Sequence, residues 1–239
     1  MSAGNLYFET AGALLQDIAA HEMEKIKQVG QAAARSIMEG GILHLFGVGH
    51  SALPAHELYI RAGSLTNARP ISLEYILDLF EQVNGVGATL MRNFDGLPGE
   101  VLIVLSNSGV NPLPLEVILE AKKKKLFTVG ISSFTHSLAV EPKHPSGKRL
   151  MDIVDIAIDT HVPAGDAGLE LPGVPSKVCP LSNVAGITIV NAITAETIEQ
   201  IVSLGGIPPV RISRNMPGGA EHNRKYIEQY GDRIPGLRL

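Results

Sequence analysis

Apolar positions in the first forty residues recur with the spacing of an α-helix. Between Tyr7 and Met38 they fall three or four residues apart, and Gly40-Gly41 follows as a stop signal. The pattern predicts an N-terminal helical arm over residues 7–39, made of one long helix or of two. Its apolar positions include Leu14, Leu15, Ile18, Met23, Ile26, Val29, Ala33 and Ile37.

Two units of the same kind follow, each with a short apolar strand, a loop rich in glycine and serine, and a helix. Asn111 and Pro112 are typical of a helix start, as N-cap and first helical residue. Such units alternate strands with helices and therefore predict a parallel sheet covered on both faces. The strand, loop and helix occupy residues 42–46, 47–51 and 52–62 in the first unit and 101–105, 106–111 and 112–125 in the second.

The second half of the chain adds strands at 126–131 and 153–158, separated by a polar loop. Residues 162–180 are dense in proline and glycine and predict a long loop that forms the wall of a site. A long apolar helix is expected at 184–204, and a polar tail at 208–239 includes a short helix near its end.

The elements together predict one α/β domain spanning residues 1–239. We expect a doubly wound parallel sheet of about five strands with flanking helices, similar to flavodoxin-like folds. The long apolar helices near both ends of the domain favour a homodimer or homotetramer.

The composition of the chain disfavours several classes of function. The chain is 45% hydrophobic and has a net charge of −4, so it can bury a core but has no basic field for nucleic acid or an anionic membrane. It has one cysteine, no apolar run long enough to span a bilayer and no secretory leader, and we expect a cytoplasmic protein.

The two loops offer neutral hydrogen-bond donors at the carboxyl ends of parallel strands, where such sheets bind ligands. Ser51 and Ser108 precede or begin helices, whose free N–H groups attract anions. We therefore predict a phosphate monoester site. Three other kinds of site are disfavoured. The first loop lacks the third glycine of the dinucleotide-binding fingerprint, and no Gly-Lys-Ser/Thr sequence of a P-loop occurs. The second loop lacks the first glycine of a nucleophile elbow.

The sequences Gly47-Val-Gly-His-Ser51 and Leu105-Ser-Asn-Ser-Gly-Val-Asn111 resemble the two phosphate loops of the sugar isomerase (SIS) domain family. The similarity is greatest to the single-domain branch that includes phosphoheptose isomerases. The resemblance implies a phosphosugar ligand, no cofactor, and glycines that permit close backbone approach. The phosphosugar residues implied by the resemblance are Gly47, Gly49, Ser51, Ser106, Asn107, Ser108, Gly109 and Asn111. His50 is a further candidate: its imidazole can donate to a substrate hydroxyl, or it has only a structural role in the loop.

Aldose–ketose isomerisation requires a general base and an acid. Arg61 occupies the position of the family's first catalytic glutamate, and residues 184–204 contain no histidine. We expect Glu57, on the helix after the first loop, to be the base, with His56 and Glu196 as further candidates. An ion pair between Glu57 and Arg61 at i,i+4 is the competing interpretation.

Glu221, His222 and Asn223 follow a glycine pair and predict a lid over this site or a neighbouring subunit's, with a surface helix cap as the alternative. The histidines show no zinc-like spacing, so no metal is expected. The function that we predict is sugar-phosphate isomerisation. An amino-sugar-phosphate lyase, etherase or deaminase and a non-catalytic phosphosugar sensor are the alternatives.

Overall fold

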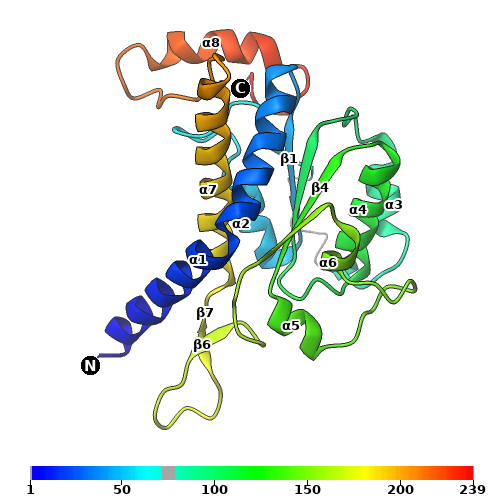
Figure 1. Cartoon of the computed structure of the whole chain (residues 1–239), viewed down its shortest axis with the longest axis vertical. Coiled ribbons are helices and arrows are strands. Elements are labelled where there is room, and N and C mark those ends of the chain that lie inside the picture. The colour runs from blue at the N-terminus through cyan, green and yellow to red at the C-terminus, as the bar shows by residue number, and fades with distance from the viewer. Residues whose placement is uncertain (1, 72–78, 239) are drawn as a thin grey trace.

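The structure, a computed structural model, describes residues 2–71 and 79–238. Its centre is a five-stranded parallel sheet with the strand order β2-β1-β3-β4-β5 (Figure 1). The strands begin nearly level, since Leu43 pairs with Val101 and Val101 pairs with Phe127. The predicted α/β fold class is confirmed. The strands are β1 (Leu43–Gly47), β2 (Ala68–Pro70), β3 (Val101–Leu105), β4 (Phe127–Ser132) and β5 (Ile156–Asp159).

Helices cover both faces of the sheet (Figure 1). The two long helices α1 and α7 pack against each other and against one face, and α4 covers the other. Within the described residues the helices are α1 (Ala3–Met38), α2 (Ala52–His56), α3 (Val86–Leu90), α4 (Pro112–Lys123), α5 (Phe134–Ala139), α6 (Leu150–Ile153), α7 (Ser182–Ser203) and α8 (Gly219–Tyr230). The 3₁₀ turns η1 (Gly49–Ser51) and η3 (Met91–Asn93) precede α2 and follow α3.

Alternate side chains of the strands feed two separate parts of the core. Leu45 and Ile103 point to the cluster that contains Ile189 of α7, whereas their neighbours Phe46 and Val104 join the cluster on the α4 side. Because successive strand residues face opposite sides, a strand covered on both faces must be apolar throughout. This accounts for the unbroken apolar run of β3. In β1 the run is interrupted by His44, which is buried and pairs with Glu100.

Helix α1 is one continuous helix that begins at Ala3, four residues before the predicted start. The hydroxyl of Ser2 accepts a hydrogen bond from the Asn5 N–H at 3.2 Å and caps it. Close contact with α7 is made at Gly30, where a Cβ atom would lie 2.7 Å from the Cβ of Glu196. The backbones approach there only because Gly30 has no side chain.

Several segments differ from the sequence-based expectations, and β2 and α3 were not predicted. The helix after the first loop ends at His56 instead of residue 62, and Ile60 has a left-handed φ of 50° that a helix does not accommodate. The polar loop before β5 contains α5 and α6. The proline- and glycine-rich segment contains an antiparallel pair of short strands, β6 (Ala167–Leu169) and β7 (Val178–Pro180).

The C-terminal segment closes the amino end of the sheet. Tyr226 and Tyr230 of α8 form a small cluster with Ile234 and Leu237 around Ile42, which directly precedes β1. In Figure 1, α8 accordingly lies at the end of the molecule where β1 begins. Within the described residues, no helix has the length and apolar character required to cross a membrane.

Glu100, which directly precedes β3, is a buried carboxylate at the amino end of the sheet. It accepts hydrogen bonds from His44 Nε2 at 2.8 Å, from the Leu97 N–H at 2.8 Å and from Arg233 Nη1 at 2.5 Å. Burial alone would raise the pKa of Glu100, but these bonds outweigh burial and hold the pKa well below its usual range. The carboxylate therefore stays ionised and ties the tail to the sheet.

Candidate functional site

The loop after β1 is a tight turn built on glycine. A Cβ atom on Gly47 would lie 2.0 Å from the backbone oxygen of Ser51, and Gly49 has a φ of +54°. The Ser51 N–H donates to the Val48 carbonyl at 3.0 Å. The turn folds back so closely that only glycine fits at residue 47, and it presents Ser51 at the carboxyl end of the sheet.

The loop after β3 is held by its own serine. The hydroxyl of Ser106 accepts a hydrogen bond from the Gly109 N–H at 3.2 Å, and Gly109 has a φ of +61°. The Asn107 carbonyl accepts from the Ser133 N–H at 2.9 Å, which fastens the loop to the end of β4. This loop is therefore fixed at the same edge of the sheet as the first.

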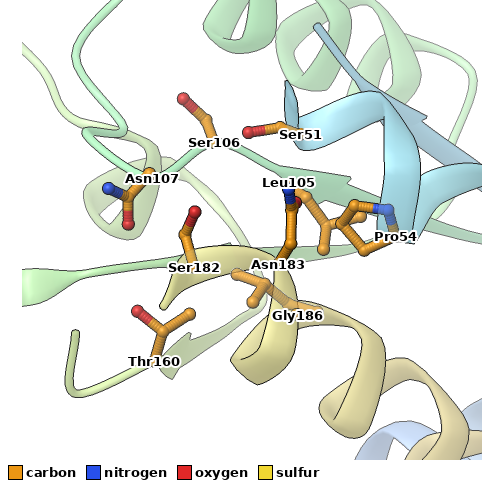
Figure 2. Close-up of a pocket in the computed structure, with 10 residues that line it drawn as sticks. Ser51, Pro54, Leu105, Ser106, Asn107, Thr160, Ser182, Asn183 and Gly186 are labelled. Atoms are coloured by element: carbon orange, nitrogen blue, oxygen red, sulfur yellow. The ribbon is translucent and has the colours of Figure 1, made fainter. Parts of the chain in front are cut away.

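A pocket of about 250 Å³, counting its open mouth, lies between these two loops and the first turn of α7 (Figure 2). Figure 2 shows Ser182 and Asn183 of α7 pointing toward the side where Ser51 and Ser106 lie. Every polar side chain in the lining is a hydroxyl or an amide. The ten lining residues are Ser51, Pro54, Leu105, Ser106, Asn107, Ile131, Thr160, Ser182, Asn183 and Gly186.

Thr160, Ser182 and Asn183 were not predicted from the sequence. They come from the end of β5 and the start of α7, and their positions in the chain carry no motif that connects them with the two loops. The available indication was topological: β5 was predicted to be parallel, so its carboxyl end had to reach the same edge.

The first turn of α7 already has an anionic partner. The Asp166 carboxylate accepts hydrogen bonds from the N–H groups of Leu181 at 3.0 Å and Ser182 at 2.8 Å, and from the Ser182 hydroxyl at 2.7 Å. Because a carboxylate occupies this helix start, a second anion is repelled from it. The side of the pocket formed by Ser51 and Ser106 has no such carboxylate among its lining residues.

Besides the glycines Gly47, Gly49 and Gly109, three predicted phosphosugar residues lie outside the pocket lining. His50 is exposed, Ser108 is half-buried, and Asn111 is buried at the start of α4. The Asn111 side chain makes no capping hydrogen bond, and its Oδ1 atom has no hydrogen-bond partner in the described part of the chain. The structure thus places Ser51, Ser106 and Asn107 together and leaves the other three beside them.

The candidate bases do not line the pocket. Glu57 forms an ion pair with Arg61 at 3.1 Å and accepts from the Asn191 amide at 3.3 Å. The Nδ1 atom of His56 lies 2.7 Å from the Ala52 carbonyl. The predicted i,i+4 pair of Glu57 and Arg61 is therefore present, and the second carboxylate oxygen is bound by Asn191 of α7.

Glu196 is farther away. It lies on α7 about 20 Å along the helix from Ser182, at the α-helical rise of 1.5 Å per residue. Its Cβ is the atom that would meet a side chain on Gly30 of α1. Within one chain, Glu196 belongs to the contact between the two long helices.

The predicted lid residues lie at the opposite end of the sheet from the pocket. The Asn223 side chain accepts from the Ile212 N–H at 3.0 Å and donates to the Ile212 carbonyl at 2.7 Å, and it is buried. The His222 Nε2 atom lies 2.9 Å from the Val210 carbonyl, and Glu221 is exposed. These residues do not cover the pocket of their own chain; a part in a neighbouring subunit's site stays a prediction.

One group of described residues has the composition of a metal site. Ligand atoms of Asp17, His21 and His161 lie within 4.8 Å of one another. The two Asp17 oxygens already pair with His21 Nδ1 at 2.9 Å and His161 Nδ1 at 3.2 Å. One carboxylate shared by two imidazoles explains this arrangement without an ion.

Comparisons with known proteins agree with this geometry. The family model described as SIS domain matches residues 6–133, which include both loops. A UPF0309 protein of Geobacillus kaustophilus is 36% identical over 241 residues, covering 98% of this chain and 96% of its own. A UPF0309 protein of Listeria monocytogenes is 37% identical over 243 residues, covering 98% of each chain.

Among solved structures, a phosphoheptose isomerase from Francisella tularensis superposes with a TM-score of 0.58 at 16% identity, covering 83% of this chain and 100% of its own. At that identity the likeness establishes the fold alone. The family model matches more than half of the sequence, and both loops that carried the resemblance fall inside the match. The chain therefore belongs to the SIS domain family.

Proposed function

We propose that the pocket between the two loops and α7 binds a sugar phosphate. The observation that carries the proposal is the lining: hydroxyl and amide groups from four separate segments converge on one small cavity at the carboxyl ends of the strands. Neutral donors of this kind suit a phosphate monoester and the hydroxyl groups of a sugar. The phosphoheptose isomerase that shares the fold is named for a reaction of such a compound.

The charges around the pocket orient the ligand. Asp166 repels the phosphate from the start of α7, so the phosphate binds on the side of Ser51 and Ser106. The sugar then extends toward Ser182 and Asn107. The Asn107 Oδ1 atom is buried and lacks a hydrogen-bond partner among the described residues. A sugar hydroxyl would supply the donor that this oxygen needs.

Replacement of Ser51 or Ser106 by Ala tests the phosphate side. Each variant should weaken binding of a sugar phosphate by about tenfold or more, because a hydrogen bond to a charged group contributes about 1.5–3 kcal/mol. Isothermal titration calorimetry measures the change. Ser203→Ala, at the exposed end of α7, is the matched control and should bind as wild type does. Equal weakening of the unphosphorylated sugar would contradict the assignment.

The reaction proposed for this pocket is aldose–ketose isomerisation, with Glu57 as the base and His56 beside it. Glu57 is the C-cap residue of α2, the helix that follows the first loop. Glu57→Gln keeps the shape and removes basicity, so turnover should fall by about a hundredfold or more while ligand affinity is kept. Turnover that is unchanged in Glu57→Gln would remove this residue from the mechanism.

A non-catalytic phosphosugar sensor is the second candidate, and one observation favours it. None of the ten described lining residues has an acidic or basic side chain, whereas isomerisation requires a group that accepts a proton. The two candidates differ in one experiment: a sugar phosphate that stabilises the protein in a thermal-shift screen is either converted or recovered unchanged after long incubation. Conversion supports the isomerase, and unchanged ligand supports the sensor.

A further inference from the structure

Arg211 is a buried cation without a counter-charge. The residue is 5% exposed, and its Nη1 atom is buried with no hydrogen-bond partner among residues 2–71 and 79–238. Its backbone is fixed on both sides, since the Arg211 N–H donates to the Ser64 carbonyl at 2.9 Å and the Gly63 N–H donates to the Arg211 carbonyl at 2.8 Å. No carboxylate of the described residues forms an ion pair with Arg211.

This arrangement is unfavourable unless something else pairs with the guanidinium. A buried charge loses its hydration, and in folded proteins such a charge is ordinarily paired. Burial lowers the pKa of Arg211, and the neighbouring Arg214 lowers it further, which shows that the surroundings disfavour the cation. A guanidinium nevertheless stays protonated in proteins, so the positive charge remains.

Arg211 is one of the residues that line a pocket at the surface of the protein. A pocket of about 650 Å³, counting its open mouth, is lined by both arginines and by the hydroxyl-bearing Ser213. Apolar side chains complete the wall, and none of the lining residues is acidic. The described lining consists of Ile60, Ala62, Arg211, Ile212, Ser213, Arg214 and Gly236.

We propose that this pocket binds a small molecule with an oxyanion group, a phosphate ester or a carboxylate, which pairs with Arg211 and Arg214. An oxyanion accepts the donors that Arg211 has free, and a guanidinium binds carboxylate and phosphate through two parallel hydrogen bonds. The apolar residues Ile60 and Ile212 fit the carbon skeleton of such a ligand.

This site is separate from the pocket between the two loops. Its segments join the sheet through Leu65, which forms a bridge with Val210 shortly before β2 begins. It therefore lies toward the amino ends of the strands, whereas the loop pocket lies at their carboxyl ends. The inference does not depend on the proposed function, because it rests on different residues.

Arg211→Met tests the proposal. In wild type, inorganic phosphate, sulfate or acetate should raise the melting temperature above that in chloride of equal ionic strength. In Arg211→Met the rise caused by at least one of these anions should be lost, and binding measured by calorimetry should weaken by about tenfold or more. Without the anion, the variant should be as stable as wild type or more stable, because an unpaired buried charge has been removed.

Two controls separate this site from other effects. Arg224→Met removes an exposed arginine on α8 and should keep the full response to the anion. Ser106→Ala, in the loop pocket, should keep the part of the response that Arg211→Met removes. Comparison of phosphate and sulfate with acetate distinguishes phosphate esters from carboxylates as the preferred ligand class.

Several results would overturn the proposal. One is a wild-type melting temperature that no anion raises beyond chloride, and another is an anion response that persists in Arg211→Met. If Arg211→Met does not fold, Arg214→Gln replaces it, and unchanged anion affinity in that variant has the same meaning. Sedimentation measures the oligomeric state of wild type and of Arg211→Met. If wild type shows no response to anions and Arg211→Met has a different oligomeric state, the counter-charge comes from a second copy of this chain and the proposal is wrong.

Discussion

At the residue scale, Gly47 is the position on which the first loop depends. An added Cβ would lie 2.0 Å from the Ser51 oxygen and 2.5 Å from its carbonyl carbon, both of them backbone atoms. Backbone cannot move aside as a flexible side chain can. Gly47→Ala should therefore displace Ser51, weaken sugar-phosphate binding by about tenfold or more, and lower the free energy of unfolding by about 1–3 kcal/mol.

Calorimetric titration and urea denaturation of Gly47→Ala measure the two effects. Wild-type affinity in this variant would mean that the turn does not position the phosphate.

Some residues of the site could be predicted from the sequence, because Ser51, Ser106 and Asn107 belong to two compact motifs. Thr160 and Asn183 could not be found in this way, because only the fold brings them to the motifs.

At the element scale, the contact between α1 and α7 depends on a second glycine. A Cβ on Gly30 would lie 2.7 Å from the Cβ of Glu196, whereas one on Gly12 of the same helix meets nothing within 4 Å in the described structure. Gly30→Ala should destabilise the protein by about 1–3 kcal/mol. Gly12→Ala, the matched control, should stabilise it by up to about 1 kcal/mol, since alanine favours helix.

Urea denaturation of both variants provides the free energies. If Gly30→Ala is as stable as Gly12→Ala, the two helices do not pack closely at this point.

Periodicity predicted both long helices, because each has many apolar positions at regular spacing. It did not predict β2, which has three residues, nor the early end of α2, which follows from the left-handed Ile60. Short elements take their conformation from tertiary contacts more than from local pattern.

The network around Glu100 links elements far apart in the chain and predicts a pH dependence. The pKa of Glu100 is held well below its usual value of 4.5, so the stability it contributes is present above about pH 4.5 and is lost as the pH falls below that. Burial lowers the pKa of His44, so the unfolded chain takes up this proton first and stability also declines as the pH falls below about 6.5.

Glu100→Gln should lower the free energy of unfolding at pH 7 by about 3 kcal/mol or more, because Arg233 and the buried His44 lose their anionic partner. Below pH 4.5 the variant should also lose stability less steeply than wild type. Urea denaturation at a series of pH values from 7 down to about 3 measures both effects. Parallel pH profiles for the two proteins would show that Glu100 is not the group responsible.

At the scale of the whole molecule, the two ends of the sheet have different chemistry. The carboxyl ends gather neutral hydroxyl and amide groups around the loop pocket, and the amino ends gather charged side chains, with Glu100 paired and Arg211 unpaired. The net charge of −4 gave no indication of this division, because opposite charges cancel in a sum over the chain. The alternation of strand, loop and helix in the two units was predictable from the sequence, and it indicated that their loops share one edge of the sheet.

The central proposal is that the loop pocket binds a sugar through its phosphate. Isothermal titration calorimetry of one sugar phosphate and of the same sugar without phosphate, on wild type and on Ser106→Ala, tests it most directly. We expect wild type to bind the phosphorylated compound much more tightly, and Ser106→Ala to lose about tenfold or more of that affinity with little change for the free sugar. Equal affinity of wild type for both compounds, or the same loss for both in Ser106→Ala, would contradict it.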